Sequence, residues 1–272
     1  MLDGELVIPI DGDLSFADLQ LRLHPAASRV RQLAAAHAAV LVAFDLLVDE
    51  RGRLLTGQPL SLRRRRLEEF MARTGSSPAL QLSPAIPDLT HARRWLRTMG
   101  GGLDGIVAKR LDAVYESGAR TGAMQKVKDL RTADCVVGGF RYATAGKVVG
   151  SLLLGLYDQA GLIHHVGFTS SIPAAEKKAL TVRLEKLRRP PGFTGNAPGG
   201  PSRWSTERSG EWEPLAPELV VEVRYDHFTG GRFRHGTKLL RWRPDKDPRQ
   251  CFMDHVEHES RSPLGLLAGA RY

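Results

Sequence analysis

The residue pattern of the chain changes near residues 129–133, and this change limits the folds that its 272 residues can adopt. Before it, apolar residues at helical spacing alternate with short apolar runs, which is typical of mixed α/β structure. After it, strand-like segments separated by glycine-containing turns dominate. The pattern predicts an α+β chain of two domains, residues 1–130 and 131–256, followed by a tail at 257–272.

Local signals predict helices in the first half. Ser15 is a good N-cap residue for the apolar helical pattern that follows it, and Ser61 is predicted to cap a later helix. In that later helix Arg64 and Glu68 are four residues apart and can pair. The four arginines at residues 63–66 could contact phosphate, but a helix distributes them around more than half its circumference, so we expect them to be mostly solvated.

The residue pattern of the second half predicts a small β-barrel. One helix, opened by Pro173, interrupts the strands, and the Pro- and Gly-rich residues 190–201 form a loop. Several strands with one intervening helix suit a Greek-key barrel such as the OB-fold. The predicted strands are residues 135–142, 148–157, 162–168 and 219–225.

Composition restricts the partners and the compartment. A net charge of +9 and a pI near 9.9 favour binding to polyanions such as nucleic acid. Cys135 and Cys251 do not make a disulfide framework, which fits a reducing cytoplasm. No apolar run approaches the roughly 20 residues of a membrane span, and no signal-peptide pattern begins the chain, so we expect no membrane association.

Five short strings stand in a fixed order along the chain. Each combines residue types suited to nucleotide or phosphate chemistry, since carboxylates bind metal and sugar hydroxyls and paired cations bind phosphate. The strings are LDGE at residues 2–5, FDLL at 44–47, DGIVAK at 104–109, KVK at 126–128 and RWRPDK at 241–246.

In kind and order these strings resemble the nucleotidyl-transferase motifs of ATP-dependent DNA ligases, with the compact bacterial end-joining and repair type as the best match. The resemblance implies an incomplete nucleotidyl-transferase domain of ATP-grasp-like ligase type, followed by an OB-fold domain. It also implies ATP and Mg²⁺ or Mn²⁺ as cofactors and nicked or broken duplex DNA as the substrate. A repair polymerase or an end-binding protein is an implied partner, and a bacterial cytoplasm with nucleoid association is the implied location.

The resemblance assigns nucleotide and metal contacts in the first domain. Glu5 would lie beside the ribose, Phe44 would stack on adenine, and Lys109 would bind the nucleotide. Glu5 and Asp104 would be metal ligands. Many relatives carry Glu where this chain has Asp104, which is one methylene shorter but still offers hard oxygen ligands for Mg²⁺.

Phosphate contacts come from basic residues near the end of each domain. Lys126 and Lys128 are two apart, so on a strand they face the same side and suit the α-phosphate. By resemblance, Arg243 and Lys246 act on the ATP pyrophosphate during adenylation. The residues expected to contact DNA or phosphate are Arg120, Arg232, Arg234, Lys238, Arg241 and Arg243.

The family's nucleophile is the lysine of a Lys-x-Asp-Gly string, and no such string occurs in the 272 residues. We therefore expect that this chain does not adenylate itself. A truncated reading of a longer gene best explains the missing string, with docking to a separate N-terminal segment as another explanation. A segment lacking part of its sheet should also expose strand edges that favour association.

Two alternative functions stay open from sequence. RNA ligases and capping-type guanylyltransferases use the same lysine chemistry, and GTP labelling or RNA nicks would distinguish them. A non-catalytic OB-type remnant would bind nucleic acid with steep salt dependence and without a nucleotide requirement.

Overall fold

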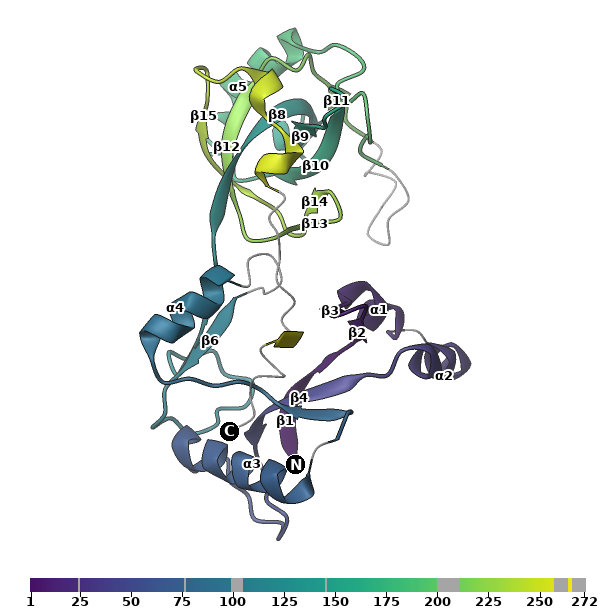
Figure 1. Cartoon of the computed structure of the whole chain (residues 1–272). Coiled ribbons are helices and arrows are strands. Elements are labelled where there is room, and N and C mark those ends of the chain that lie inside the picture. The colour runs from purple at the N-terminus through teal and green to yellow at the C-terminus, as the bar shows by residue number, and fades with distance from the viewer. Residues whose placement is uncertain are drawn as a thin grey trace. The chain divides into compact units, whose positions relative to one another are not determined.

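The structure is a computed structural model that describes residues 1–23, 25–75, 77–98, 105–144, 146–199, 211–256 and 264–265 (Figure 1). The chain divides into two compact units, and the boundary between them in the sequence falls between Lys128 and Asp129. The elements of the first unit are β1 (Leu2–Val7), β2 (Pro9–Ile10), β3 (Asp13–Leu14), α1 (Phe16–Leu21), α2 (Ala27–Ala36), β4 (Val40–Leu46), α3 (Leu60–Thr74), β5 (Leu80–Leu82), α4 (Leu89–Thr98), β6 (Ile106–Lys109) and β7 (Met124–Val127).

A three-stranded sheet organises the first unit. Strand β4 lies in the middle, antiparallel to β1 and parallel to β5. Helix α3 packs on this sheet, and its Leu67 meets Ala43 and Leu46 of β4 in a small apolar cluster. A separate two-stranded ribbon pairs β6 with β7. The strings at residues 2–5 and 44–47 therefore lie on adjacent paired strands.

The two predicted helix caps have different outcomes. Ser15 caps α1 as predicted, because its side chain accepts a hydrogen bond from the Asp18 backbone N–H at 3.2 Å. The prediction that Ser61 caps the later helix is wrong, since α3 begins at Leu60 and Ser61 lies inside it. The backbone N–H groups of Leu60 and Ser61 donate to the carbonyls of Ala113 and Leu111, each at 2.9 Å. The backbone N–H groups at the start of α3 therefore donate to carbonyls of a distant segment and not to a side-chain cap.

The second unit is rich in antiparallel strands. Its sheet has the order β10-β9-β8-β12-β15, with β11 paired to β8. Helix α5 begins at Lys177, four residues after Pro173, and it buries Leu180 and Leu184. The elements are β8 (Arg131–Tyr142), β9 (Val149–Tyr157), β10 (Ile163–Thr169), α5 (Lys177–Lys186), β11 (Glu213–Pro214), β12 (Val220–Tyr225), β13 (Phe228–Thr229), β14 (Arg232–Phe233), β15 (Lys238–Trp242), and the 3₁₀ turns Pro248–Gln250 and Met253–His255.

Strand pairing does not close a barrel within the described residues. The outer strands of the sheet are β10 and β15, and they are connected by an isolated bridge between Thr169 and Thr237. The Thr169 hydroxyl donates to the Thr237 carbonyl at 3.0 Å and accepts from the Leu239 backbone N–H at 3.2 Å. The predicted barrel is therefore an OB-type sheet whose edges are joined by a few hydrogen bonds around Thr169 and Thr237 rather than by a full ladder.

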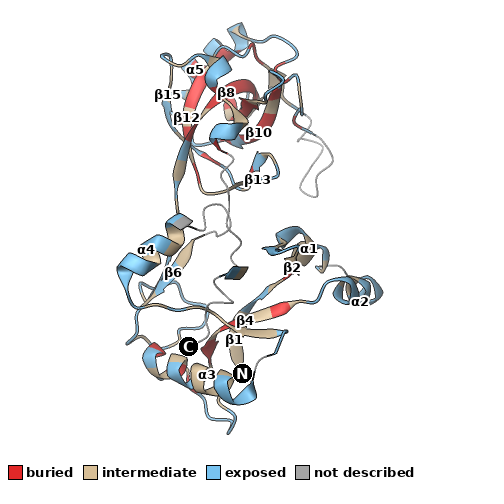
Figure 2. Cartoon of the chain, in the orientation of Figure 1, coloured by how far each residue is buried: buried red, intermediate tan, exposed pale blue. Residues whose placement is uncertain are grey.

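Burial is concentrated in the second unit, as the red segments of β8, β10 and β12 show in Figure 2. Phe140, Leu152 and Leu154 have no exposed surface, and buried residues of β8, β9, β10 and β12 contribute to one core. Among the described residues, no helix is long and apolar enough to cross a membrane.

Candidate active site

Two carboxylates face each other in the sheet of the first unit. The register of β1 and β4 places Asp3 of the LDGE string opposite Asp45 of the FDLL string. Like charges directly opposite on paired strands are destabilising unless each finds a partner. The Tyr115 hydroxyl donates to Asp3 at 2.8 Å, and Asp45 accepts from Arg63.

Arg63 is the most engaged side chain of this site, and only 3% of it is exposed. Its Nε and Nη2 donate to the two oxygens of Asp45 at 2.9 and 3.0 Å. Its Nη1 donates to the backbone carbonyls of Gln58 and of Ala113, the latter at 3.2 Å. The guanidinium also lies 5.7 Å from the centre of the Tyr115 ring. One arginine thus ties α3 to β4 and to the segment after β6.

The expectation that the four arginines are mostly solvated is wrong for the first two. Arg63 is buried, and Arg64 donates to Glu68 at 2.7 Å and to the Ser83 carbonyl at 2.7 Å, so its side chain is only 13% exposed. The predicted pair of Arg64 with Glu68 is confirmed. Arg65 and Arg66 do face solvent, with side chains 67% and 45% exposed. The docking of α3 on the sheet decides which arginines are covered.

Lys109 covers one face of Phe44, with its Nζ 4.2 Å from the ring centre. A cation at this distance is attracted by the negative face of the ring. Burial lowers the pKa of Lys109, while Asp45 and Asp3 act in the opposite direction and favour the charged amine. The amine of the DGIVAK string therefore lies among the side chains of LDGE and FDLL, although the three strings are far apart in sequence.

Glycine is required at two positions of the strings. A Cβ at Gly105 would lie 2.3 Å from the Val127 carbonyl oxygen, and the φ of Gly105 is +139°. A Cβ at Gly4 would lie 2.7 Å from the Val42 carbonyl oxygen, beside the register shift between Asp3 and Gly4. The absence of a Cβ at these glycines lets the backbone of DGIVAK lie close to KVK and the backbone of LDGE lie close to β4.

The remaining predicted residues of the first unit are more exposed. Glu5 is exposed on β1, Lys126 is exposed on β7, Lys128 is exposed directly after that strand, and Arg120 is exposed in the turn before it. Asp104 lies outside the described residues. No group of three or more metal-binding side chains occurs within the described ranges.

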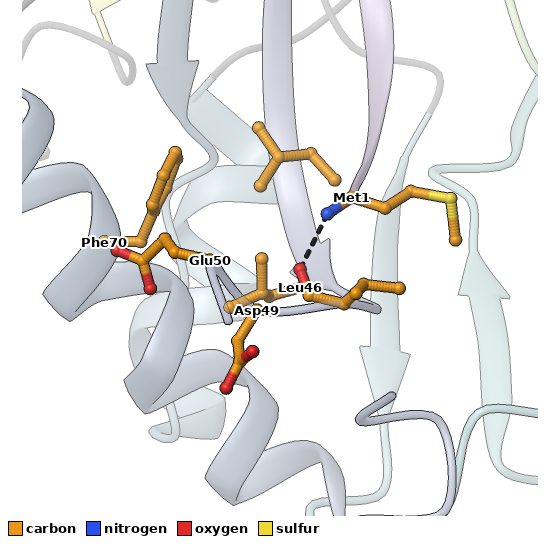
Figure 3. A pocket seen from close by; sticks show the side chains of 7 residues that line it. Met1, Leu46, Asp49, Glu50 and Phe70 are labelled. Atoms are coloured by element: carbon orange, nitrogen blue, oxygen red, sulfur yellow. Dashed lines mark hydrogen bonds between the residues drawn. The ribbon is translucent and has the colours of Figure 1, made fainter. Parts of the chain in front are cut away.

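A hollow near the start of the chain is separate from this network. It has a volume of about 130 Å³ and is lined by Met1, Leu46, Asp49, Glu50 and Phe70 among others (Figure 3). Pockets that bury small ligands usually measure about 300–1,000 Å³. None of the predicted nucleotide contacts lines this hollow, so we do not assign it to the site.

In the second unit, Arg243 of the RWRPDK string is held by carboxylates. Its Nη1 donates to both oxygens of Asp134 at 2.8 and 2.9 Å, and its Nε and Nη2 donate to Asp245 at 3.0 and 2.9 Å. The carboxylates raise the pKa of Arg243, and the guanidinium lowers the pKa of Asp245 to about 2. Lys246 Nζ lies 4.0 Å from Asp134.

Arg241 is also paired, because its Nε donates to Glu222 at 2.5 Å. This contact lowers the pKa of Glu222. Arg241 nevertheless keeps 63% of its side chain exposed, so it can reach a ligand in solution. Sequence inspection did not identify Asp134 or Glu222, since nothing in their local sequence distinguishes them from other strand acids.

The other predicted phosphate contacts lie around β14 and β15. Arg232 is exposed and donates to Nδ1 of His165 at 3.1 Å. Burial, reinforced by nearby arginines, lowers the pKa of His165 to about 3, so its ring is neutral at pH 7. Arg234 is half-buried, and Lys238 is exposed at the start of β15. The structure thus gathers Arg241, Arg243 and Lys246 with their carboxylates, and Arg232 with His165.

Comparison with known proteins agrees with this geometry. Residues 1–128 match the family described as "ATP dependent DNA ligase domain", and residues 145–246 match "ATP dependent DNA ligase C terminal region". DNA ligase C2 of Mycolicibacterium smegmatis is 46% identical over 96% of this chain and 77% of the relative. DNA ligase C of Mycobacterium tuberculosis is 41% identical over 94% of this chain and 75% of the relative.

A solved structure titled "DNA binding with a minimal scaffold: Structure-function analysis of Lig E DNA ligases" has a TM-score of 0.54 at 20% identity. It covers 89% of this chain and 76% of the solved one, and it supports the fold alone. Fold, strings and relatives together define a class of nucleotide-binding DNA-repair enzymes. The chain belongs to the ATP-dependent DNA ligase family and is of the ligase C type.

Proposed function

We propose that this protein seals nicks or joins ends in duplex DNA during repair, by adenylation of a lysine, AMP transfer to a 5′-phosphate and phosphodiester formation. The observation that carries the proposal is the network in the first unit. Three contacts, Asp3 with Tyr115, Asp45 with Arg63 and Lys109 with Phe44, connect the LDGE, FDLL and DGIVAK strings to one another or to segments up to 112 residues away. Such convergence is what positioning a nucleotide requires.

Within this site we propose nucleotide roles for individual residues. Phe44 stacks on adenine, and Glu5 accepts hydrogen bonds from the ribose hydroxyls. Lys109, Lys126 and Lys128 supply positive charge to the phosphates. The lysines on β7 and after it are exposed, so an incoming α-phosphate can reach them.

A divalent cation, Mg²⁺ or Mn²⁺, fits the chemistry of this donor set. Glu5 offers an exposed carboxylate, and Asp104 is the second proposed ligand. Few protein ligands suffice, because Mg²⁺ keeps several waters and takes oxygens from substrate phosphates. When bound, the cation would neutralise charge on the phosphate oxygens during in-line displacement.

The second unit is proposed to be an OB domain, with domain limits at residues 1–130, 131–256 and 257–272. Arg243 and Lys246 would contact the pyrophosphate of ATP while AMP is transferred to the lysine. The proposed DNA-backbone contacts are Arg120, Arg232, Arg234, Lys238 and Arg241. Arginine suits this work because its planar fork matches phosphate oxygens.

The chemistry consists of three displacements at phosphorus. The lysine nitrogen attacks the α-phosphorus of ATP and pyrophosphate leaves; a DNA 5′-phosphate oxygen then attacks the adenylate and the lysine leaves. Finally the 3′-hydroxyl attacks the activated phosphate and AMP leaves. Residues of both units would act by positioning and charge stabilisation, which dominate phosphoryl-type transfer.

The experiment that tests the proposal combines binding with covalent labelling. We expect the chain to bind ATP in preference to GTP and to form no lysine adenylate with α-labelled ATP and Mg²⁺ or Mn²⁺. Lys126→Ala should weaken ATP binding, whereas Lys147→Ala, a change at an exposed lysine of the second unit, should not. A labelled band that is stable to alkali but is released by acid and by hydroxylamine, as a phosphoramidate is, would show that another lysine is the nucleophile. Absence of ATP binding would refute the nucleotide site.

The same assays separate the alternative functions. Preferential GTP labelling would indicate a guanylyltransferase, and preferential sealing of RNA nicks once a Lys-x-Asp-Gly segment is supplied would indicate an RNA ligase. Salt-sensitive nucleic-acid binding with no effect of ATP would indicate a binding protein. We expect sealing of a nicked DNA duplex with ATP when that segment is supplied.

A further inference from the structure

A row of charged residues crosses three strands of the second unit. Asp134 on β8 is opposite Glu222 on β12, and Glu222 is opposite Arg241 on β15. Two acids side by side on one face of a sheet repel each other, so the row needs cations to be stable. The RWRPDK string supplies them, because Arg241 pairs with Glu222 and Arg243 pairs with Asp134.

The cluster is electrically balanced. Its acids are Asp134, Glu222 and Asp245, and its bases are Arg241, Arg243 and Lys246, so the formal charges cancel. A phosphate that approaches therefore meets no net positive charge, although three of the residues proposed to bind phosphate are present. It gains a strong contact only if a carboxylate gives up its arginine.

The two carboxylates on Arg243 differ in how they can move. Asp245 is two residues away in the same segment, so it travels with Arg243 wherever that segment goes. Asp134 is 109 residues away on β8, a strand buried in the core of the unit. A carboxylate and a phosphate use the same edge of a guanidinium. A phosphate that takes the Nη1 edge of Arg243 must therefore displace Asp134.

We propose that Asp134 and Glu222 are positioning residues that compete with phosphate groups for Arg243 and Arg241. They hold the two arginines extended in a geometry close to the one a phosphate needs, and they lower the affinity of the OB domain for phosphate until the correct ligand arrives. The inference rests on the proposed function, in which these arginines contact ATP pyrophosphate or the DNA backbone.

The first test measures binding of inorganic pyrophosphate to the full chain at low salt. Asp134→Asn keeps an oxygen acceptor but removes the charge, and we expect it to tighten binding by about fivefold, the upper end for a partly exposed ion pair. Arg243→Gln should weaken binding, and the double variant Asp134→Asn with Arg243→Gln should lose the gain. Glu213→Gln is the matched control, since Glu213 pairs with Arg188 at 2.5 Å elsewhere in the same unit.

The outcomes distinguish the inference from the proposed function. If Arg243→Gln binds pyrophosphate as well as the unaltered chain, the proposed role of Arg243 is wrong. If Arg243→Gln weakens binding but Asp134→Asn tightens binding of neither pyrophosphate nor DNA, only the competition is refuted. If Glu213→Gln tightens pyrophosphate binding as much as Asp134→Asn does, the effect comes from net charge alone, and the competition is refuted as well. Thermal unfolding of each variant checks folding, and Asp134→Ser repeats the test if the Asn variant is unstable.

A second arm uses a nicked DNA duplex without ATP. Glu222→Gln releases the exposed Arg241, and we expect about twofold tighter binding with a salt-dependence slope steeper by about one counterion. An effect of Asp134→Asn on pyrophosphate but not on DNA would assign Arg243 to the polyphosphate. The reverse pattern would assign it to the DNA backbone, and no effect on either ligand would overturn the proposal.

Discussion

Removal of the Arg63 guanidinium should destabilise the first unit strongly. Arg63→Met keeps the apolar stem but leaves Asp45, which is 2% exposed, as a buried carboxylate with its cation removed. It also leaves the carbonyls of Gln58 and Ala113 without their donor. Breaking a buried ion pair by removing one partner costs about 3–5 kcal/mol, because the remaining charge cannot be solvated.

Urea unfolding followed by far-ultraviolet circular dichroism measures this loss. With a slope of about 2 kcal/mol per molar urea for a domain of this size, the midpoint of the first unit should fall by roughly 2 M. Arg65→Met on the same helix is the control, because its side chain is 67% exposed and surface changes cost at most about 0.5 kcal/mol.

The double variant separates folding from positioning. Asp45→Leu combined with Arg63→Met replaces the pair by apolar side chains, and such replacements are often neutral to stability. It should recover most of the stability but not the affinity for ATP, since Tyr115 and the segment after β6 lose their anchor. A cost below about 1 kcal/mol for Arg63→Met, or a double variant as unstable as the single one, would refute the reasoning.

Three further predictions concern single residues. Burial lowers the pKa of His165 from 6.5 to about 3, so protonation favours the unfolded chain as the pH falls from 6.5 to 3. In urea titrations the free energy of unfolding of the second unit should therefore fall by up to about 1.4 kcal/mol per pH unit, and His165→Gln should remove this component. Gly105→Ala should lower the melting temperature through about 1–3 kcal/mol of strain, since the added Cβ meets the Val127 carbonyl; an unchanged melting curve would contradict this. Phe44→Leu should weaken ATP binding by about tenfold or more but leave tripolyphosphate binding unchanged, since base stacking is worth about 1–3 kcal/mol; equal loss for both ligands would argue against stacking.

The sequence alone determined the elements whose signals are local. Ser15 caps α1 because its hydroxyl needs only the backbone N–H three residues later, and the apolar runs of β8, β9 and β10 indicate burial directly. The ordered strings were also sufficient to predict the family, because their residue types and their order can be read directly from the sequence.

Tertiary structure decided what depends on distant partners. Ser61 does not act as a cap, because the N–H groups at a helix start can donate to any carbonyl oxygen, and the fold supplies those of Leu111 and Ala113. Arg63 is buried and Arg65 is not, although their local sequence is alike, because only one of them faces β4.

The same reason applies to the charged site residues. The strings predicted Arg243 as a phosphate contact, but only strand pairing between β8, β12 and β15 brought Asp134 to its guanidinium. Pairing of β1 with β4 likewise set Asp3 against Asp45. A residue's own chemistry can be read along the chain, whereas its pKa, its exposure and its partner depend on which strand lies beside it.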